Sequence, residues 1–148
     1  MSLTPFSFVD GALDRADHLR ADPDALHALW PNARIIVLDA EGRALADEAR
    51  QLFVLAGTDV GYVPTSFNFL GLQEGQAWFF AESAALAIVA PERVDLRRAA
   101  AKWPAWQATL FAQARALQHW HARHRHCSAC GGTSRFVRAG WLGVCDAC

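Results

Sequence analysis

The last 22 residues contain every cysteine of the chain, arranged as two CxxC pairs. The pairs are separated by fourteen residues: Cys127 with Cys130, and Cys145 with Cys148. A CxxC turn presents two thiolates to one side of a metal ion, and a second pair completes the tetrahedron of a structural zinc site. The intervening RFVRAGWLGV predicts two short strands around Ala139 and Gly140. The spacing therefore predicts a zinc ribbon over residues 127–148, with zinc as its cofactor.

Disulfides, a redox-active CxxC and an iron–sulfur cluster compete with zinc for the same cysteines. The start, MSLTPFSFVDGALDRADHLR, lacks the basic and apolar regions of a secretory signal, so we expect a cytoplasmic protein, in which disulfides are rare. A redox CxxC usually opens a helix in a βαβ unit, which the pattern does not predict here. Four nearby histidines could join a mixed site, but four cysteines suffice, and we expect surface, outer-shell or packing roles for His119, His121, His124 and His126.

The charge of the chain is strongly asymmetric. Residues 1–96 carry six arginines and fourteen acidic residues, a net charge of −8. Residues 97–148 carry seven arginines, one lysine and a single acid, Asp146, a net charge of +7. This distribution fits an anionic ligand or acidic partner near the tail, and it equally fits attraction between the two parts of the chain.

The rest of the sequence reads as a mixed α/β body followed by helices. ADPDALHALWPN predicts a short helix capped by Asp22, and ARIIVLDAEGRALAD predicts strand, turn and strand. QLFVLAG is a further strand candidate, FNFLGL and AWFFAES predict a hairpin, and AALAIVA fits a strand or a helix. No run approaches the roughly 18 apolar residues of a membrane span, so we expect no membrane contact.

From Pro91 onward the pattern becomes helical. ERVDLRRAAAKW predicts one helix, and a long second helix follows Pro104. Its apolar stripe, with Phe111 and Trp120 beside it, indicates core packing; the stripe consists of Trp106, Leu110, Ala114 and Leu117. The expected fold class is α+β, divided into an α/β domain (residues 1–103), a connecting helix (104–126) and a zinc ribbon (127–148).

The sequence gives fewer signals of catalysis than of structure. Tetrathiolate zinc has no open coordination position and activates no water. The sequence contains no GxSxG, Walker or GxGxxG motif, and its acids are scattered. The sequence therefore predicts a structural or binding module with no catalytic residues.

Four segments, in this order and spacing, resemble the N-terminal half of NADH pyrophosphatases of the Nudix superfamily: FLGLQEGQAWFFA, VDLRRAAA, ARALQHWHARHRHCSACGG and AGWLGVCDAC. The resemblance begins near Asp14 and continues to the end of the chain. It implies an α/β domain, a four-cysteine zinc ribbon and a subsequent catalytic Nudix domain.

The resemblance also implies a function. Members of the family hydrolyse NAD(H) to nicotinamide mononucleotide and AMP with magnesium or manganese, some remove NAD caps from RNA, and they are usually homodimers. The four cysteines match the family's zinc ligands. Arg97 matches an arginine associated with substrate contact, although the residues themselves also allow Arg97 to pair with Asp95 or Glu92.

The Nudix signature, Gx5Ex7REUxEExGU with U aliphatic, is absent from these 148 residues, and no Arg-Glu or Glu-Glu pair occurs. We therefore expect a fragment that ends at the last zinc ligand, inactive by itself. The alternative is a stand-alone zinc-ribbon module that binds nucleic acid or a protein, using Arg135, Arg138 and Trp141 for phosphate contacts and stacking.

Overall fold

A computed structural model describes residue 8 and residues 13–148 of the chain. Residues 1–7 and 9–12, within the start that lacks the pattern of a secretory signal, lie outside the described residues. In chain order the elements are β1 (Leu13–Asp14), η1 (Asp17–Ala21), α1 (Pro23–Leu29), η2 (Trp30–Asn32), β2 (Arg34–Leu38), β3 (Ala44–Ala46), β4 (Val54–Ala56), η3 (Gly57–Asp59), β5 (Asn68–Gln73), β6 (Gln76–Glu82), α2 (Ser83–Leu86), β7 (Glu92–Val94), α3 (Leu96–Lys102), α4 (Ala105–Arg123), β8 (Ser134–Val137) and β9 (Leu142–Cys145).

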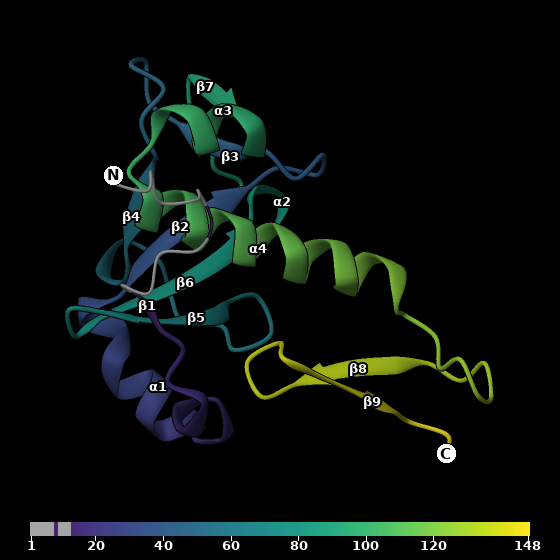
Figure 1. Cartoon of the computed structure of the whole chain (residues 1–148). Helices are drawn as coiled ribbons and strands as arrows, with labels where there is room; N and C mark the ends of the chain where they lie inside the picture. The colour runs from purple at the N-terminus through teal and green to yellow at the C-terminus, as the bar shows by residue number, and fades with distance from the viewer. Residues whose placement is uncertain (1–7, 9–12) are drawn as a thin grey trace, which may run out of the picture.

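A seven-stranded sheet forms the centre of the body (Figure 1). Its order is β1-β5-β6-β2-β3-β7, and β4 also pairs with β2. Only β2 and β6 run parallel; the other pairs are antiparallel. The β5–β6 hairpin predicted from the sequence is present, with its turn at Glu74 and Gly75. The expected α+β class is confirmed.

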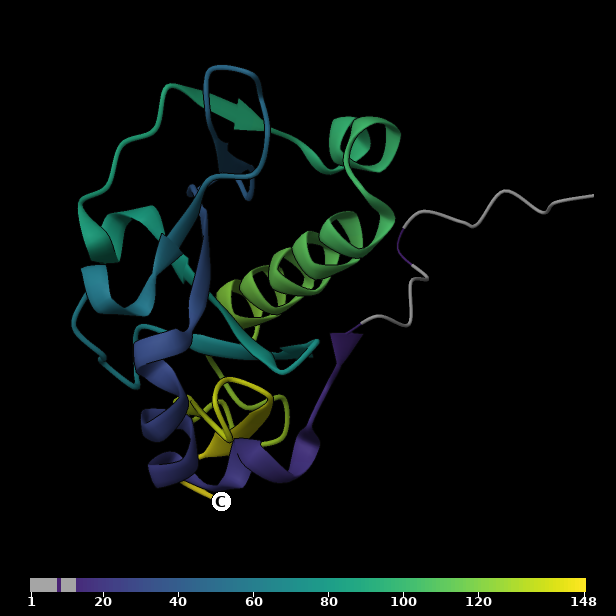
Figure 2. The ribbon, with the colours of Figure 1, turned by 90° about the vertical axis from the view of Figure 1, so that its left-hand side faces the viewer.

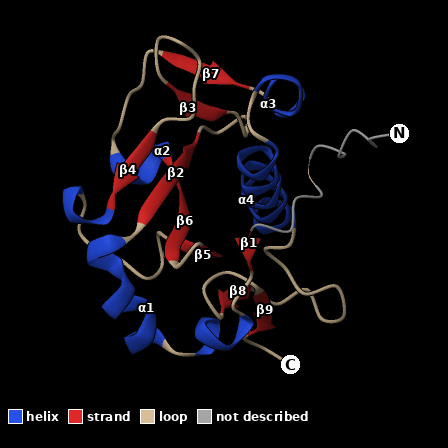
Figure 3. Cartoon of the chain, turned by 60° about the vertical axis from the view of Figure 1, so that its left-hand side comes forward, coloured by secondary structure: helices blue, strands red, loops and turns tan. Residues whose placement is uncertain are grey.

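Helices cover both faces of this sheet, with α1 on one side and α4 on the other (Figure 3). Successive strand residues point to opposite faces. Ile36 and Leu38 belong to the apolar cluster under α4, whereas Ile35 and Val37 belong to the cluster under α1. Strand β2 thus contributes apolar side chains to the core on both faces of the sheet.

Helix α4 is part of the core. Leu110, Ala114 and Leu117 of the predicted stripe are buried in the cluster on the sheet, and Trp106 packs partly buried against it. Pro104 occupies the N-cap position, directly before the first helical residue, Ala105. The core packing expected from the stripe is confirmed, and it fixes the direction in which the helix leads to the ribbon.

Two local expectations need correction or completion. Glu92–Val94, expected at the start of a helix, forms strand β7 and pairs antiparallel with β3. Val94 is fully buried in that pairing, and the helix begins only at Leu96, capped by Asp95, which accepts from Arg98 N at 2.8 Å. The ambiguous segment AALAIVA forms the short helix α2 and then irregular chain.

The strands β8 and β9 form a separate two-stranded sheet, as the sequence predicted. This ribbon lies against the lower end of the body, beside η1 and α1 (Figure 2). No helix in the described part of the chain is long and apolar enough to cross a membrane.

Candidate metal centre

The four cysteine thiols gather at one end of the ribbon. The Sγ atoms of Cys127 and Cys148 lie 3.8 Å apart, and those of Cys130 and Cys145 lie 3.5 Å apart. All four sulfur atoms lie within 4.8 Å of one another. Zinc held by four thiolates at about 2.3 Å needs sulfur–sulfur distances of about 3.8 Å at tetrahedral angles. The spacing therefore fits a zinc ion, and the four cysteines could hold one.

The backbone supports the same arrangement. Gly132 N lies 3.4 Å from Cys130 Sγ, and Ala147 N lies 3.3 Å from Cys145 Sγ, so both amides can donate to a thiolate. Gly131 has φ +75°, a left-handed conformation that glycine adopts at little cost. A Cβ at Gly132 would lie 2.7 Å from the Cβ of Ala147, which explains a second glycine after the first cysteine pair.

The thiols also show opposed protonation preferences. Hydrogen bonds from the backbone amides of Cys130 and Ala129 lower the pKa of Cys127 to about 6. Hydrogen bonds shared with the thiols of Cys130 and Cys145 raise the pKa of Cys148 to about 12. Cys148 thus keeps its proton more readily than Cys127 does. A divalent cation stabilises all four thiolates together.

The neighbouring histidines take other positions. Within the described residues, the group of potential metal ligands consists of the four cysteines alone. His121 Nε2 donates to Gly140 O at 2.7 Å, and its ring centroid lies 4.0 Å from that of Phe136. His124 Nδ1 lies 3.0 Å from Trp120 O. His121 therefore has a packing role, and the exposed His124 has a surface role, both among the roles expected for the histidines.

The ribbon is fastened to the body by its hairpin tip. Trp141 Nε1 donates to Phe69 O of β5 at 2.6 Å, and the guanidinium of Arg20 lies 3.7 Å from the Trp141 ring centroid. Arg138 forms an ion pair with Asp17 at 2.9 Å. These contacts join the basic tail to the acidic body, which is one of the two explanations that the charge asymmetry allowed.

The tip itself has an unusual backbone. Arg138 and Ala139 both have φ +53°, and Gly140 has φ +94°. Residues other than glycine pay about 1–2 kcal/mol each for this left-handed conformation. Such conformations occur where surrounding tertiary contacts stabilise them. Here those contacts are the ones just described, together with Asn68, whose side chain leaves no room for a Cβ at Gly140.

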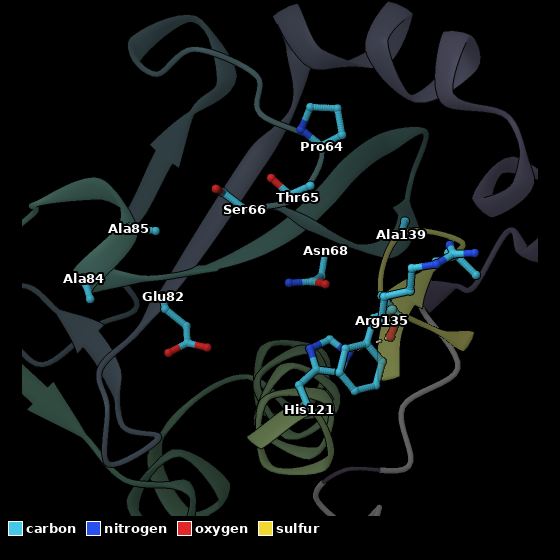
Figure 4. A pocket seen from close by; sticks show the side chains of 13 residues that line it. Pro64, Thr65, Ser66, Asn68, Glu82, Ala84, Ala85, His121, Arg135 and Ala139 are labelled. Atoms are coloured by element: carbon cyan, nitrogen blue, oxygen red, sulfur yellow. Dashed lines mark hydrogen bonds between the residues drawn. The ribbon is translucent and has the colours of Figure 1, made fainter. Parts of the chain in front are cut away.

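A hollow of about 650 Å³ lies between the ribbon and the body (Figure 4). The sheet contributes Asn68 and Glu82, α4 contributes His121, and the ribbon contributes Arg135. Burial lowers the pKa of His121, although the bond to Gly140 and the nearby charge of Glu82 oppose this shift. The neutral ring is therefore favoured at this position.

Arg97 lies elsewhere. It is exposed on α3, at the end of the body opposite to the ribbon (Figures 1 and 3). Glu92 pairs with Arg50 at 3.3 Å, and Asp95 caps α3, so both suggested partners of Arg97 have other contacts. No ion pair of Arg97 occurs within residue 8 and residues 13–148.

The arginines of the tail do not form one patch. Arg135 pairs with Asp146 at 2.8 Å inside the ribbon, Arg138 pairs with Asp17 of the body, and Arg97 is remote from both. Trp141 likewise donates a hydrogen bond to the backbone of the body. The residues suggested for a stand-alone nucleic-acid-binding ribbon are therefore already engaged in intramolecular contacts.

No family model matches the chain. Curated relatives do match it: the NAD-capped RNA hydrolases NudC of Mycobacterium tuberculosis (strain H37Rv) and Mycobacterium bovis (strain BCG / Pasteur 1173P2) are each 35% identical over 136 residues. The chain is a homologue of NudC. The match covers 88% of this chain and 44% of each NudC relative, so the chain spans less than half of their length. The family resemblance identified from the sequence is confirmed.

The sequence did not indicate the body residues that hold the ribbon. Asp17 and Arg20 lie in η1, more than a hundred positions before their partners, and nothing local distinguishes them from other charged residues. Arg20 is only 7% exposed, but burial of an arginine becomes visible only in the folded chain.

Proposed function

We propose that these 148 residues form the non-catalytic N-terminal and zinc-ribbon portion of a Nudix-type NAD(H) diphosphatase. Such an enzyme cleaves the dinucleotide pyrophosphate to nicotinamide mononucleotide and AMP, and NAD-capped RNA is a further substrate. The observation that carries this proposal is the 35% identity to NudC hydrolases over 88% of the chain, combined with coverage of 44% of those relatives.

The distribution of carboxylates supports a structural role for these residues and a catalytic role for a domain outside them. Pyrophosphate cleavage uses divalent metals that neutralise developing charge and activate water. Among the described residues, no group of three or more acidic side chains is close enough to hold such an ion, and the thiol cluster suits structural zinc instead. We assign magnesium or manganese to a catalytic domain outside these residues, and we expect the isolated chain to be inactive.

The remaining assignments follow from the family. We propose a homodimer in the cytoplasm, where the four thiols stay reduced and available to zinc. We retain the division at residues 103 and 126, with α4 leading from the body into the ribbon. Arg97, exposed and without an ion pair among the described residues, remains the candidate for substrate contact.

Hydrolysis by the complete product of the natural gene tests the proposal. The zinc-loaded protein is incubated with NADH and magnesium, and separately with NAD-capped RNA, and the products are separated by chromatography. We expect nicotinamide mononucleotide with AMP from NADH, and nicotinamide mononucleotide with 5′-monophosphorylated RNA from the capped transcript. A folded, zinc-loaded product that releases neither set would refute the proposal.

A further inference from the structure

A second hollow, of about 560 Å³, continues the one in Figure 4. The two hollows share Glu82, His121 and Phe136 as lining residues. One face of α4 and the chain just after it line the second hollow: Arg115, Gln118, His119, Ala122 and Arg125. The two hollows therefore adjoin each other between the body, α4 and the ribbon, and together we call them the α4–ribbon groove.

Two arginines line the second hollow. Arg115 lies against the turn after β2, where a Cβ at Gly42 would collide with its side chain. Arg125 follows α4, and its carbonyl accepts from Ser134 N at 2.9 Å, which ties its backbone to the ribbon. In the described part of the chain, neither arginine forms an ion pair. The second hollow therefore offers the positive charge of two guanidinium groups to an anion.

The part of the groove where the two hollows meet has a different chemistry. The half-buried ring of Phe136 packs on His121 with centroids 4.0 Å apart, and Glu82 and Asn68 face the same hollow (Figure 4). A carboxylate repels phosphate, but it accepts hydrogen bonds from the amino and imino groups of a nucleobase. An aromatic ring offers a surface on which a base can stack. Groups suited to phosphate and groups suited to a base thus line the same pair of adjoining hollows.

We propose that the α4–ribbon groove binds single-stranded RNA. Arg115 and Arg125 contact phosphates of one strand, and a base enters the hollow beside Phe136, where its edge meets Glu82. This inference rests on the proposed function, because an NAD-capped RNA presents a single strand behind the cap. Each hollow falls within the 300–1,000 Å³ of ordinary ligand pockets. A paired base has its edge and faces covered, so a duplex does not satisfy the same contacts.

Fluorescence anisotropy tests this directly. The zinc-loaded 148-residue chain is titrated into a short uncapped single-stranded RNA labelled at its 3′ end, at several salt concentrations. We expect the double variant Arg115→Gln/Arg125→Gln to bind at least about ten-fold more weakly than the unchanged chain. The slope of log affinity against log salt should fall by about 1.4, because each lost phosphate contact of a single strand removes about 0.7.

The matched control is Arg34→Gln/Arg98→Gln, which removes the same charge from exposed residues that line neither hollow. We expect it to bind RNA within about two-fold of the unchanged chain, and both doubles should retain zinc and melting temperature. Equal weakening by the two doubles, no binding at low salt, or equal affinity for an RNA duplex or heparin would overturn the inference. NADH hydrolysis by the complete gene product is measured separately, so failure here leaves the proposed function standing.

Discussion

Replacing Trp141 tests whether the ribbon and the body form one folded unit. Trp141→Ala removes the hydrogen bond to Phe69 O, worth about 1 kcal/mol, and the contact with the nearly buried Arg20, worth about 1 kcal/mol. A fully buried tryptophan loses about 3–5 kcal/mol on truncation, and the half-buried Trp141 should lose less. We therefore expect the free energy of unfolding of the body to fall by about 3 kcal/mol.

The assay is urea unfolding at saturating zinc, followed by far-ultraviolet circular dichroism, which reports mainly the sheet and helices of the body. Trp141→Phe keeps an aromatic ring over Arg20 but loses the donor to Phe69, and should cost about 1 kcal/mol. Leu142→Ala, at an exposed neighbour in β9, is the control and should change stability by less than about 0.5 kcal/mol. If Trp141→Ala changes the unfolding of the body no more than this control, the ribbon folds independently and our reasoning about its docking is wrong.

Three further predictions concern the metal, His121 and Arg97. Elemental analysis should find one zinc per chain and little in Cys130→Ser, while circular dichroism of the body persists; a reduced, folded chain without zinc would contradict the site. Burial lowers the pKa of His121 below 6.5, so the contribution of His121 to stability is complete above that pH and declines as pH falls through the lowered pKa. His121→Gln keeps a donor for Gly140 and should flatten the dependence of the unfolding free energy on pH below about 6.5. An unchanged slope would contradict this role of His121. In the complete enzyme, Arg97→Ala should lower kcat/KM for NADH about ten-fold, or about 1.4 kcal/mol, without a change in melting temperature; unchanged kinetics with a lower melting temperature would assign Arg97 to the fold.

Much of the fold could be predicted because its signals are local. Asp22 accepts from Ala25 N at 3.0 Å, as expected of a helix cap, and the β5–β6 hairpin follows from its strand pattern and its turn. The cysteine spacing predicted the sulfur cluster for the same reason, since each CxxC is a complete local turn.

The parts that were missed depend on distant partners. Glu92–Val94 continues smoothly into a helical pattern, and only pairing with β3, more than forty residues earlier, makes it a strand. Trp141 and Phe69 are 72 positions apart, and no periodicity connects them. The α4–ribbon groove exists only once this contact sets the ribbon beside α4, so the sequence could supply its arginines but not their arrangement.

The most direct test of the account compares magnesium-dependent NADH hydrolysis by two zinc-loaded proteins: the 148-residue chain and the complete product of its natural gene. We assign zinc binding and substrate docking to these residues and the cleavage of pyrophosphate to a domain outside them. We expect no turnover above the buffer blank for the chain, and nicotinamide mononucleotide and AMP in equal amounts from the complete product. Magnesium-dependent turnover by the pure chain, or a folded complete product without activity, would contradict this assignment.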